Sequence, residues 1–171
     1  MSALLTDEVE VNIRPHKFIL VAKTTIEVNI MDDEKMLNLI SKNAEMGVVG
    51  IDAVRDYASG DKFKKELSAQ REEYNKIYKS ARNMLLENGC DVSHPSAMAK
   101  MSTEMMSRMK TLTDPTDSKI AEMMLQGSAM GVAKVIRNSN EYDGSSREIR
   151  DLADKLRETE EYNIENMKRY L

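Results

Sequence analysis

The sequence has no tryptophan, a single cysteine, and only three prolines and seven glycines among 171 residues. The lone cysteine, Cys90, cannot form an intramolecular disulfide, which favours a reducing compartment such as the cytoplasm. No apolar run approaches the roughly 20 residues that a membrane-spanning helix needs. Because proline and glycine are the residues that most disfavour helices, their scarcity favours an all-α protein.

The chain also lacks an excess of positive charge. Its formal net charge is -4 at pH 7, with 32% charged and 41% hydrophobic residues. Nucleic acids and anionic membranes both attract basic surfaces, so we expect neither as a partner. The length is typical of one domain with a sizeable core. We therefore expect a globular cytoplasmic protein.

Residues 1–30 differ in pattern from the rest. VEVNI (9–13) and IEVNI (26–30) alternate apolar and polar residues, as strands do. We interpret residues 1–30 as a leader or a short β-hairpin. The alternative is that they are not native coding sequence and that translation starts at Met31. Residues 31–171 are predicted to form a single helical-bundle domain.

Five helices are predicted from apolar spacing and from helix start and stop signals. They cover residues 33–58, 62–88, 96–112, 117–139 and 147–170. The first two carry apolar stripes with alternating steps of three and four residues, which is typical of an antiparallel bundle. The helix at 117–139 is apolar around most of its circumference, so we expect it to be the most enclosed.

Two short motifs occur twice. EEYN is found at 72–75 and 160–163, and Met-Gly-Val at 46–48 and 130–132. Their order indicates an internal repeat of two helical hairpins, connected by the helix at 96–112. This plan resembles the small bacterial ferritin-like proteins. The resemblance implies an antiparallel five-helix bundle in which a crossover helix joins the two hairpins.

The resemblance raises the question of a di-iron site. Ferritin-like di-iron proteins place one Glu on each of two helices and a Glu-x-x-His on each of the other two. The two histidines here, His16 and His94, lie in no such motif. We therefore predict no catalytic residue and no cofactor. The alternative is a metal ion at a degenerate site, with Glu160 as a candidate ligand.

A candidate polar cluster emerges when residues are projected at 100° per residue onto helical wheels. Gln70 and Arg71 of one helix then face Thr159, Glu160 and Asn163 of another. We expect Arg71 to pair with Glu160 and to fix the register of the two helices. Removing one partner of a buried pair leaves a charge uncompensated, so Glu160→Gln should destabilise the fold. The alternative interpretation is a pocket for a small molecule or a metal ion.

The helix at 96–112 is rich in methionine. Its shared face is made by Met98, Met101, Met105 and Met109. These side chains are interpreted as flexible core filler. The alternatives are a groove for a partner helix and a thioether site for Cu(I), with Met98, Met101 and Met105 as ligands.

Four glycines lie inside predicted helices, where each costs about 1 kcal/mol relative to alanine. They are Gly47, Gly50, Gly127 and Gly131. We expect them to allow a close approach of the helices at 33–58 and 117–139. The alternative is that they leave room for a ligand between these helices.

These observations predict a non-catalytic binding or structural protein. It is expected to form homo-oligomers, or to bind a helical protein, through an apolar helix face. The alternative function is a metal-binding ferritin-like protein, or an oxidoreductase, with a degenerate Fe, Mn or Cu site.

Overall fold

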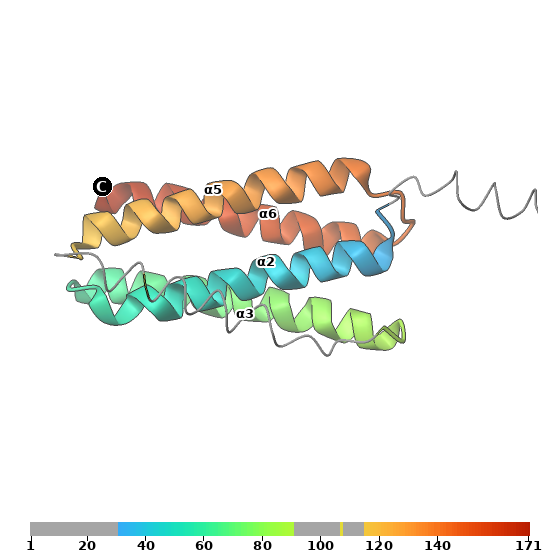
Figure 1. Cartoon of the computed structure of the whole chain (residues 1–171), viewed down its shortest axis with the longest axis horizontal. Coiled ribbons are helices and arrows are strands. Elements are labelled where there is room, and N and C mark those ends of the chain that lie inside the picture. The colour runs from blue at the N-terminus through green and yellow to red at the C-terminus, as the bar shows by residue number, and fades with distance from the viewer. Residues whose placement is uncertain (1–30, 91–106, 108–114) are drawn as a thin grey trace, which may run out of the picture. The chain divides into compact units, whose positions relative to one another are not determined.

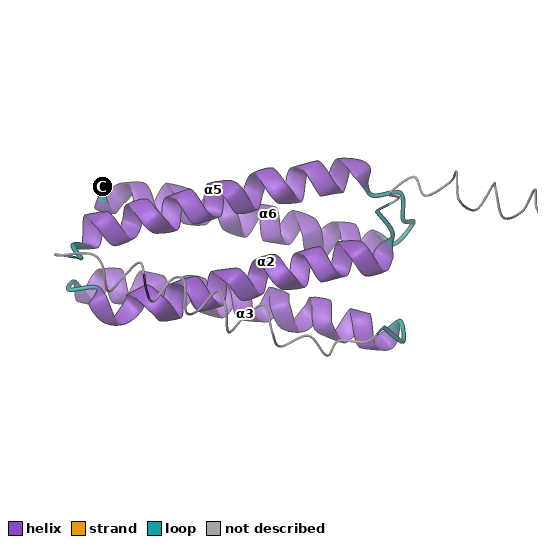
Figure 2. Ribbon diagram, in the orientation of Figure 1, coloured by secondary structure: helices purple, strands orange, loops and turns teal. Residues whose placement is uncertain are grey.

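The computed structural model describes residues 31–90, 107 and 115–171 (Figure 1). Four α-helices account for most of them: α2 (Asp33–Val54), α3 (Asp61–Glu87), α5 (Asp117–Glu141) and α6 (Arg147–Met167). Short 3-10 turns extend α2 at Arg55–Tyr57 and α6 at Lys168–Tyr170. These residues form no strand, only an isolated bridge between Met31 and Tyr142 (Figure 2). The prediction of an all-α protein is confirmed.

The prediction of a five-helix bundle is wrong, because the described residues contain four α-helices. The expected fifth helix, 96–112, lies outside the described residues, and so does the leader or hairpin expected at 1–30. The predicted count rested on apolar spacing and on helix start and stop signals, which are local and mark every amphipathic segment as a helix.

The helix ends follow local chemistry. Three of the four α-helices begin with a side chain that accepts a hydrogen bond from the backbone N–H three residues ahead, which satisfies one free donor of the first turn. The capping residues are Asp32, Thr116 and Ser146, with distances of 2.8, 3.2 and 3.3 Å. Helix α3 ends before Gly89, whose φ of 72° is a conformation that glycine adopts without penalty.

Contacts at the two ends define the direction of each helix. At one end, the Asp117 carboxylate accepts hydrogen bonds from the backbone N–H groups of Ser59 and Gly60, at 2.7 and 3.0 Å. The starts of α3 and α5 therefore lie together. At the other end, the Tyr142 hydroxyl donates to Asp33 at 2.5 Å, which joins the start of α2 to the end of α5. Helices α3 and α5 thus run in the same direction, and each is antiparallel to its hairpin partner, α2 or α6 (Figure 1).

The core lies between the four helices and is built from the predicted stripes. Its largest fully buried aliphatic and aromatic side chains come from every helix, and their removal from water is the main stabilising term. They include Leu37, Ile40, Ile51, Phe63, Leu67, Leu85, Ile120, Ile149 and Leu156.

Helix α5 is not the most enclosed helix, contrary to the expectation from its composition. Met130 is 73% exposed and Ile136 is 42% exposed. The reason is that α5 packs on α2 and α6 with one side, so its opposite side has no neighbour among the described residues. Self-association through an apolar helix face stays a prediction. No helix in the described part of the chain is long and apolar enough to cross a membrane.

Candidate functional site

A buried polar contact joins three helices near the centre of the molecule. The Tyr74 hydroxyl of α3 donates to Glu160 Oε2 of α6 at 2.5 Å. The same hydroxyl lies 3.3 Å from Ser128 Oγ of α5. All three residues are buried. Tyr74 and Glu160 belong to the two EEYN motifs, so the contact brings together one residue from each.

The glycines of the two Met-Gly-Val motifs make room for this contact. A Cβ on Gly47 would lie 2.5 Å from the ring of Tyr74, and a Cβ on Gly131 would clash with the Glu160 carboxyl group. Each glycine therefore contacts the side chain of a polar residue on the other helix of its own hairpin. The expected role, a close approach of α2 and α5, does not explain these two positions. Gly127 has open space in front of it and is not explained by packing.

Burial raises the pKa of Glu160 from 4.5 to about 7, although hydrogen bonds from Tyr74 and Ser128 act in the lowering direction. Removal from water disfavours the charged form of a carboxyl group, and here no nearby cation offsets that effect. Burial and the neighbouring Glu160 charge likewise raise the pKa of the Tyr74 hydroxyl. Near neutral pH, Glu160 is therefore poised between its neutral and charged forms.

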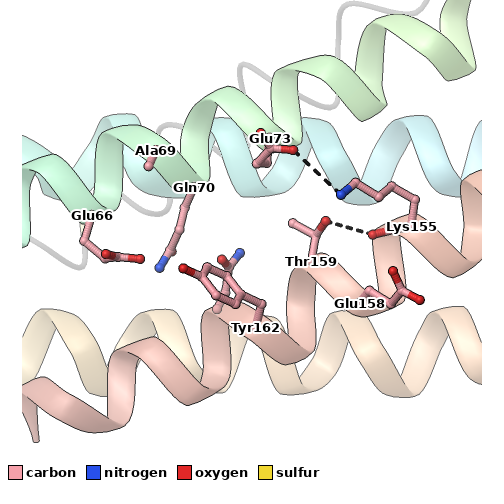
Figure 3. A pocket seen from close by; sticks show the side chains of 9 residues that line it. Glu66, Ala69, Gln70, Glu73, Lys155, Glu158, Thr159 and Tyr162 are labelled. Carbon is pink, nitrogen blue, oxygen red and sulfur yellow. Dashed lines mark hydrogen bonds and ion pairs between the residues drawn. The ribbon is translucent and has the colours of Figure 1, made fainter.

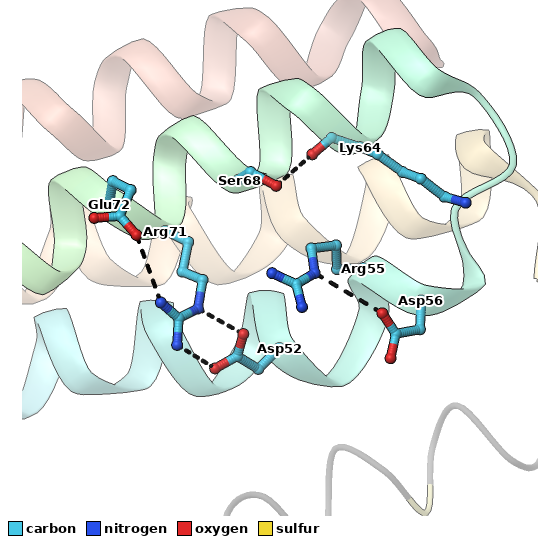
Figure 4. A network of polar contacts seen from close by, with 7 residues as sticks. All are labelled: Asp52, Arg55, Asp56, Lys64, Ser68, Arg71 and Glu72. Carbon is cyan, nitrogen blue, oxygen red and sulfur yellow. Dashed lines mark hydrogen bonds and ion pairs between the residues drawn. The ribbon is translucent and has the colours of Figure 1, made fainter.

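The expected ion pair between Arg71 and Glu160 is not formed. Arg71 instead donates to both carboxylate oxygens of Asp52 on α2, at 2.6 and 2.9 Å (Figure 4). Arg71 lies at the edge of the inward stripe, one position after Gln70. At this edge the guanidinium group reaches a surface carboxylate without losing all of its water, which a buried pair would require.

An open groove of about 480 Å³ runs between α3 and α6 (Figure 3). Its buried floor includes Gln70 from α3 and Thr159 and Asn163 from α6. Four of the five residues in the predicted polar cluster are thus buried at the interface of these helices: Gln70, Thr159, Glu160 and Asn163. Arg71 is the exception.

Two amides in the floor lack hydrogen-bond partners. Gln70 is 2% exposed, and neither its Oε1 nor its Nε2 has a partner. Asn163 is 1% exposed and its Nδ2 has no partner, although it lies near enough to Tyr74 to lower the pKa of that hydroxyl. Thr159 is satisfied, since its hydroxyl donates to the backbone carbonyl of Lys155 at 2.8 Å. A buried amide without a partner costs about 1 to 3 kcal/mol, so these atoms need an explanation.

The rim of the groove is acidic. Glu66, Glu73 and Glu158 supply three carboxylates against one ammonium group from Lys155, which leaves a formal charge of -2 among the lining residues. Glu66 is oriented by Asn166, whose Nδ2 donates to it at 2.7 Å. A hydrogen bond from Lys76 lowers the pKa of Glu73, which keeps that carboxylate charged.

Of the candidate metal ligands, only Glu160 lies among the described residues. No group of three or more His, Cys, Asp or Glu side chains able to hold a metal ion occurs among the described residues. Within the described part of the chain, Glu160 is the only buried carboxylate. Met98, Met101 and Met105 lie outside the described residues, so a thioether site there stays an untested alternative.

Sequence reasoning missed the roles of Tyr74 and Ser128. Tyr74 lies on the buried side of α3, but a helical wheel of one helix does not connect it with Glu160 of another. Ser128 precedes Gly131 by three residues and therefore lies on the same face of α5. A hydroxyl and a glycine on one face of an otherwise apolar helix were the available signal for a polar neighbour.

Comparison of the chain with protein-family models, curated proteins and solved structures gave no match. The resemblance to ferritin-like proteins therefore stays a hypothesis that rests on the sequence motifs.

Proposed function

We propose that this protein is a non-catalytic binding module whose groove between α3 and α6 holds a small polar molecule. The observation that carries the proposal is that two residues of the groove lining, Gln70 and Asn163, are buried amides with atoms that lack hydrogen-bond partners. Binding sites commonly place a few polar groups in a concave surface, where they orient the ligand.

A ligand in the groove supplies the missing hydrogen bonds. Gln70 offers one acceptor and one donor group, and Asn163 offers a donor. Bonding to these atoms removes a cost that the free protein carries, so the gain on binding is larger than at a solvated surface. The groove volume of about 480 Å³ lies within the range of small-molecule sites, roughly 300–1,000 Å³.

The chemistry of the floor supports binding rather than catalysis. Carboxamides do not exchange protons near neutral pH and are poor nucleophiles, and the Thr159 hydroxyl is engaged by a backbone carbonyl. Glu160 has a pKa of about 7, in the range of a general acid or base. Its carboxyl group, however, contacts Tyr74 and does not line the groove.

The proposal is tested by NMR of ¹⁵N-labelled protein with a panel of small amines, amides, alcohols and carboxylic acids. Binding should shift the side-chain NH₂ signals of Gln70 and Asn163, and Gln70→Leu should abolish the effect on Asn163. The matched control is Gln126→Leu, because Gln126 is exposed on α5 away from the groove. A panel in which no compound shifts these signals, or shifts that persist unchanged in Gln70→Leu, would refute the proposal.

A further inference from the structure

Resting on the proposed function, we infer that the groove selects a small organic cation, a protonated amine that also carries a neutral oxygen acceptor. Three features of the groove support this ligand class. They are the charge of its rim, the hydrogen-bonding groups of its floor and the aromatic side chain at its edge.

The rim favours a positive charge. Glu73 and Glu158 flank the groove from opposite helices, and Glu66 is held in place by Asn166. Lys76 donates to Glu73 at 2.6 Å and Lys155 lies 4.0 Å from it, and both lysine side chains are exposed, so they neutralise the rim only in part. A protonated amine in the groove interacts favourably with all three carboxylates, whereas an anion meets a net repulsion.

The hydrogen-bonding groups of the floor favour a ligand that carries both an acceptor and a donor. Nε2 of Gln70 is a donor without a partner, and Oε1 of the same amide is an acceptor without one. An ammonium group alone satisfies only Oε1. A carbonyl or hydroxyl oxygen beside the amine accepts from Nε2, so that one small molecule satisfies both atoms of the Gln70 amide.

The edge of the groove adds an aromatic surface. Tyr162 is 62% exposed and belongs to the groove lining together with Gln70 (Figure 3). Cations bind the faces of aromatic rings. The same features disfavour carboxylate-bearing molecules, including zwitterions, because their negative group adds to the charge of the rim.

The inference is tested with glycinamide, a protonated amine with a neutral carbonyl, near pH 6.5, where an α-amine is charged (pKa about 8). N-acetylglycinamide is the neutral counterpart, and glycine is the zwitterion. Titrations followed at the NH₂ signals of Gln70 and Asn163 should give tightest binding for glycinamide. Raising the salt concentration should weaken that binding, because the rim charges are exposed and screened.

A charge-neutral rim provides the decisive comparison. The double variant Glu73→Gln, Glu158→Gln should raise the dissociation constant of glycinamide by about tenfold, as expected for two exposed charge interactions. The matched control, Glu72→Gln with Glu161→Gln, removes two carboxylates of the same helices outside the groove lining. It should leave the constant within about twofold, and thermal melting of both variants checks that each is folded.

The outcomes separate this inference from the proposed function. N-acetylglycinamide or glycine binding as tightly as glycinamide overturns the inference and leaves the binding function standing. Unchanged glycinamide binding in the Glu73→Gln, Glu158→Gln protein also overturns it. If glycinamide does not shift the floor amides but another compound of the panel does, the inference fails alone. If no compound does, the proposed function fails with it.

Discussion

Replacing Glu160 with glutamine should stabilise this protein at neutral and alkaline pH. The sequence, with its expected Arg71 partner, predicted the opposite sign. In the structure Arg71 binds Asp52, and the buried Glu160 carboxyl group contacts the Tyr74 hydroxyl without a cation. Glutamine has nearly the same shape and still accepts the hydrogen bond from Tyr74, but it cannot ionise. The substitution therefore removes a buried charge at little cost in packing.

The magnitude follows from the pKa of Glu160, which burial raises from 4.5 to about 7. Between these values the folded state binds more protons than the unfolded state, so stability falls as pH rises. The loss begins near the unfolded pKa and is complete above the folded pKa. At 1.36 kcal/mol per pKa unit, the total is about 3 kcal/mol. The free-energy advantage of Glu160→Gln should thus grow by about 3 kcal/mol from pH 4 to pH 8.

The assay is urea denaturation of the wild-type and Glu160→Gln proteins at several pH values between 4 and 8. Glu161→Gln is the control, because its carboxylate is an exposed partner of Arg157 and should give no comparable trend. A stability difference that stays constant over this pH range would refute the reasoning. A Glu160→Gln protein that is less stable than the wild type at pH 8 would instead support a buried ion pair.

Four further substitutions test other parts of the structure. Gln70→Leu should raise the free energy of unfolding by about 1 to 2 kcal/mol, because it removes a buried amide without hydrogen-bond partners. Equal or lower stability in urea denaturation would show that the amide has hydrogen-bond partners in the folded protein. Gly47→Ala should lower the free energy of unfolding by about 1 to 3 kcal/mol, because the added methyl group clashes with the buried ring of Tyr74. Gly127→Ala meets no neighbour and should raise the free energy of unfolding by up to about 1 kcal/mol. Similar melting temperatures for the two variants would contradict this. Arg71→Met should cost about 1 kcal/mol or less, as expected for a partly exposed pair with Asp52, and a loss of 3 kcal/mol or more would point to a buried partner.

Helix boundaries were predicted closely from the sequence because their causes are local. Helices expected at 33–58 and 147–170 are observed as Asp33–Val54 and Arg147–Met167, each followed by a 3-10 turn that covers most of the difference. Capping side chains and apolar spacing act within a few residues and are visible in any single helix. The buried stripes were predicted for the same reason.

Arg71 shows where this local reasoning ends. A helical wheel assigns Arg71 to the edge of a face, and a long side chain at an edge can turn inward or outward. The outcome depended on Asp52, a residue of a neighbouring helix that no wheel of α3 contains. The count of helices rested on the same local signals, and the described residues contain four α-helices where five were predicted.

The sequence by itself determined that the protein is α-helical, which faces of its helices are apolar, and that Gln70, Thr159, Glu160 and Asn163 lie inward. Only the tertiary structure decided what these inward polar groups meet. In the folded protein, Tyr74 donates a hydrogen bond to Glu160, and the absence of a side chain at Gly47 and Gly131 leaves space for these two residues. Two buried amides in the lining of the acidic groove keep atoms without hydrogen-bond partners. The physical reason is that burial is a property of one helix face, whereas a hydrogen-bond partner depends on the register between helices far apart in the chain.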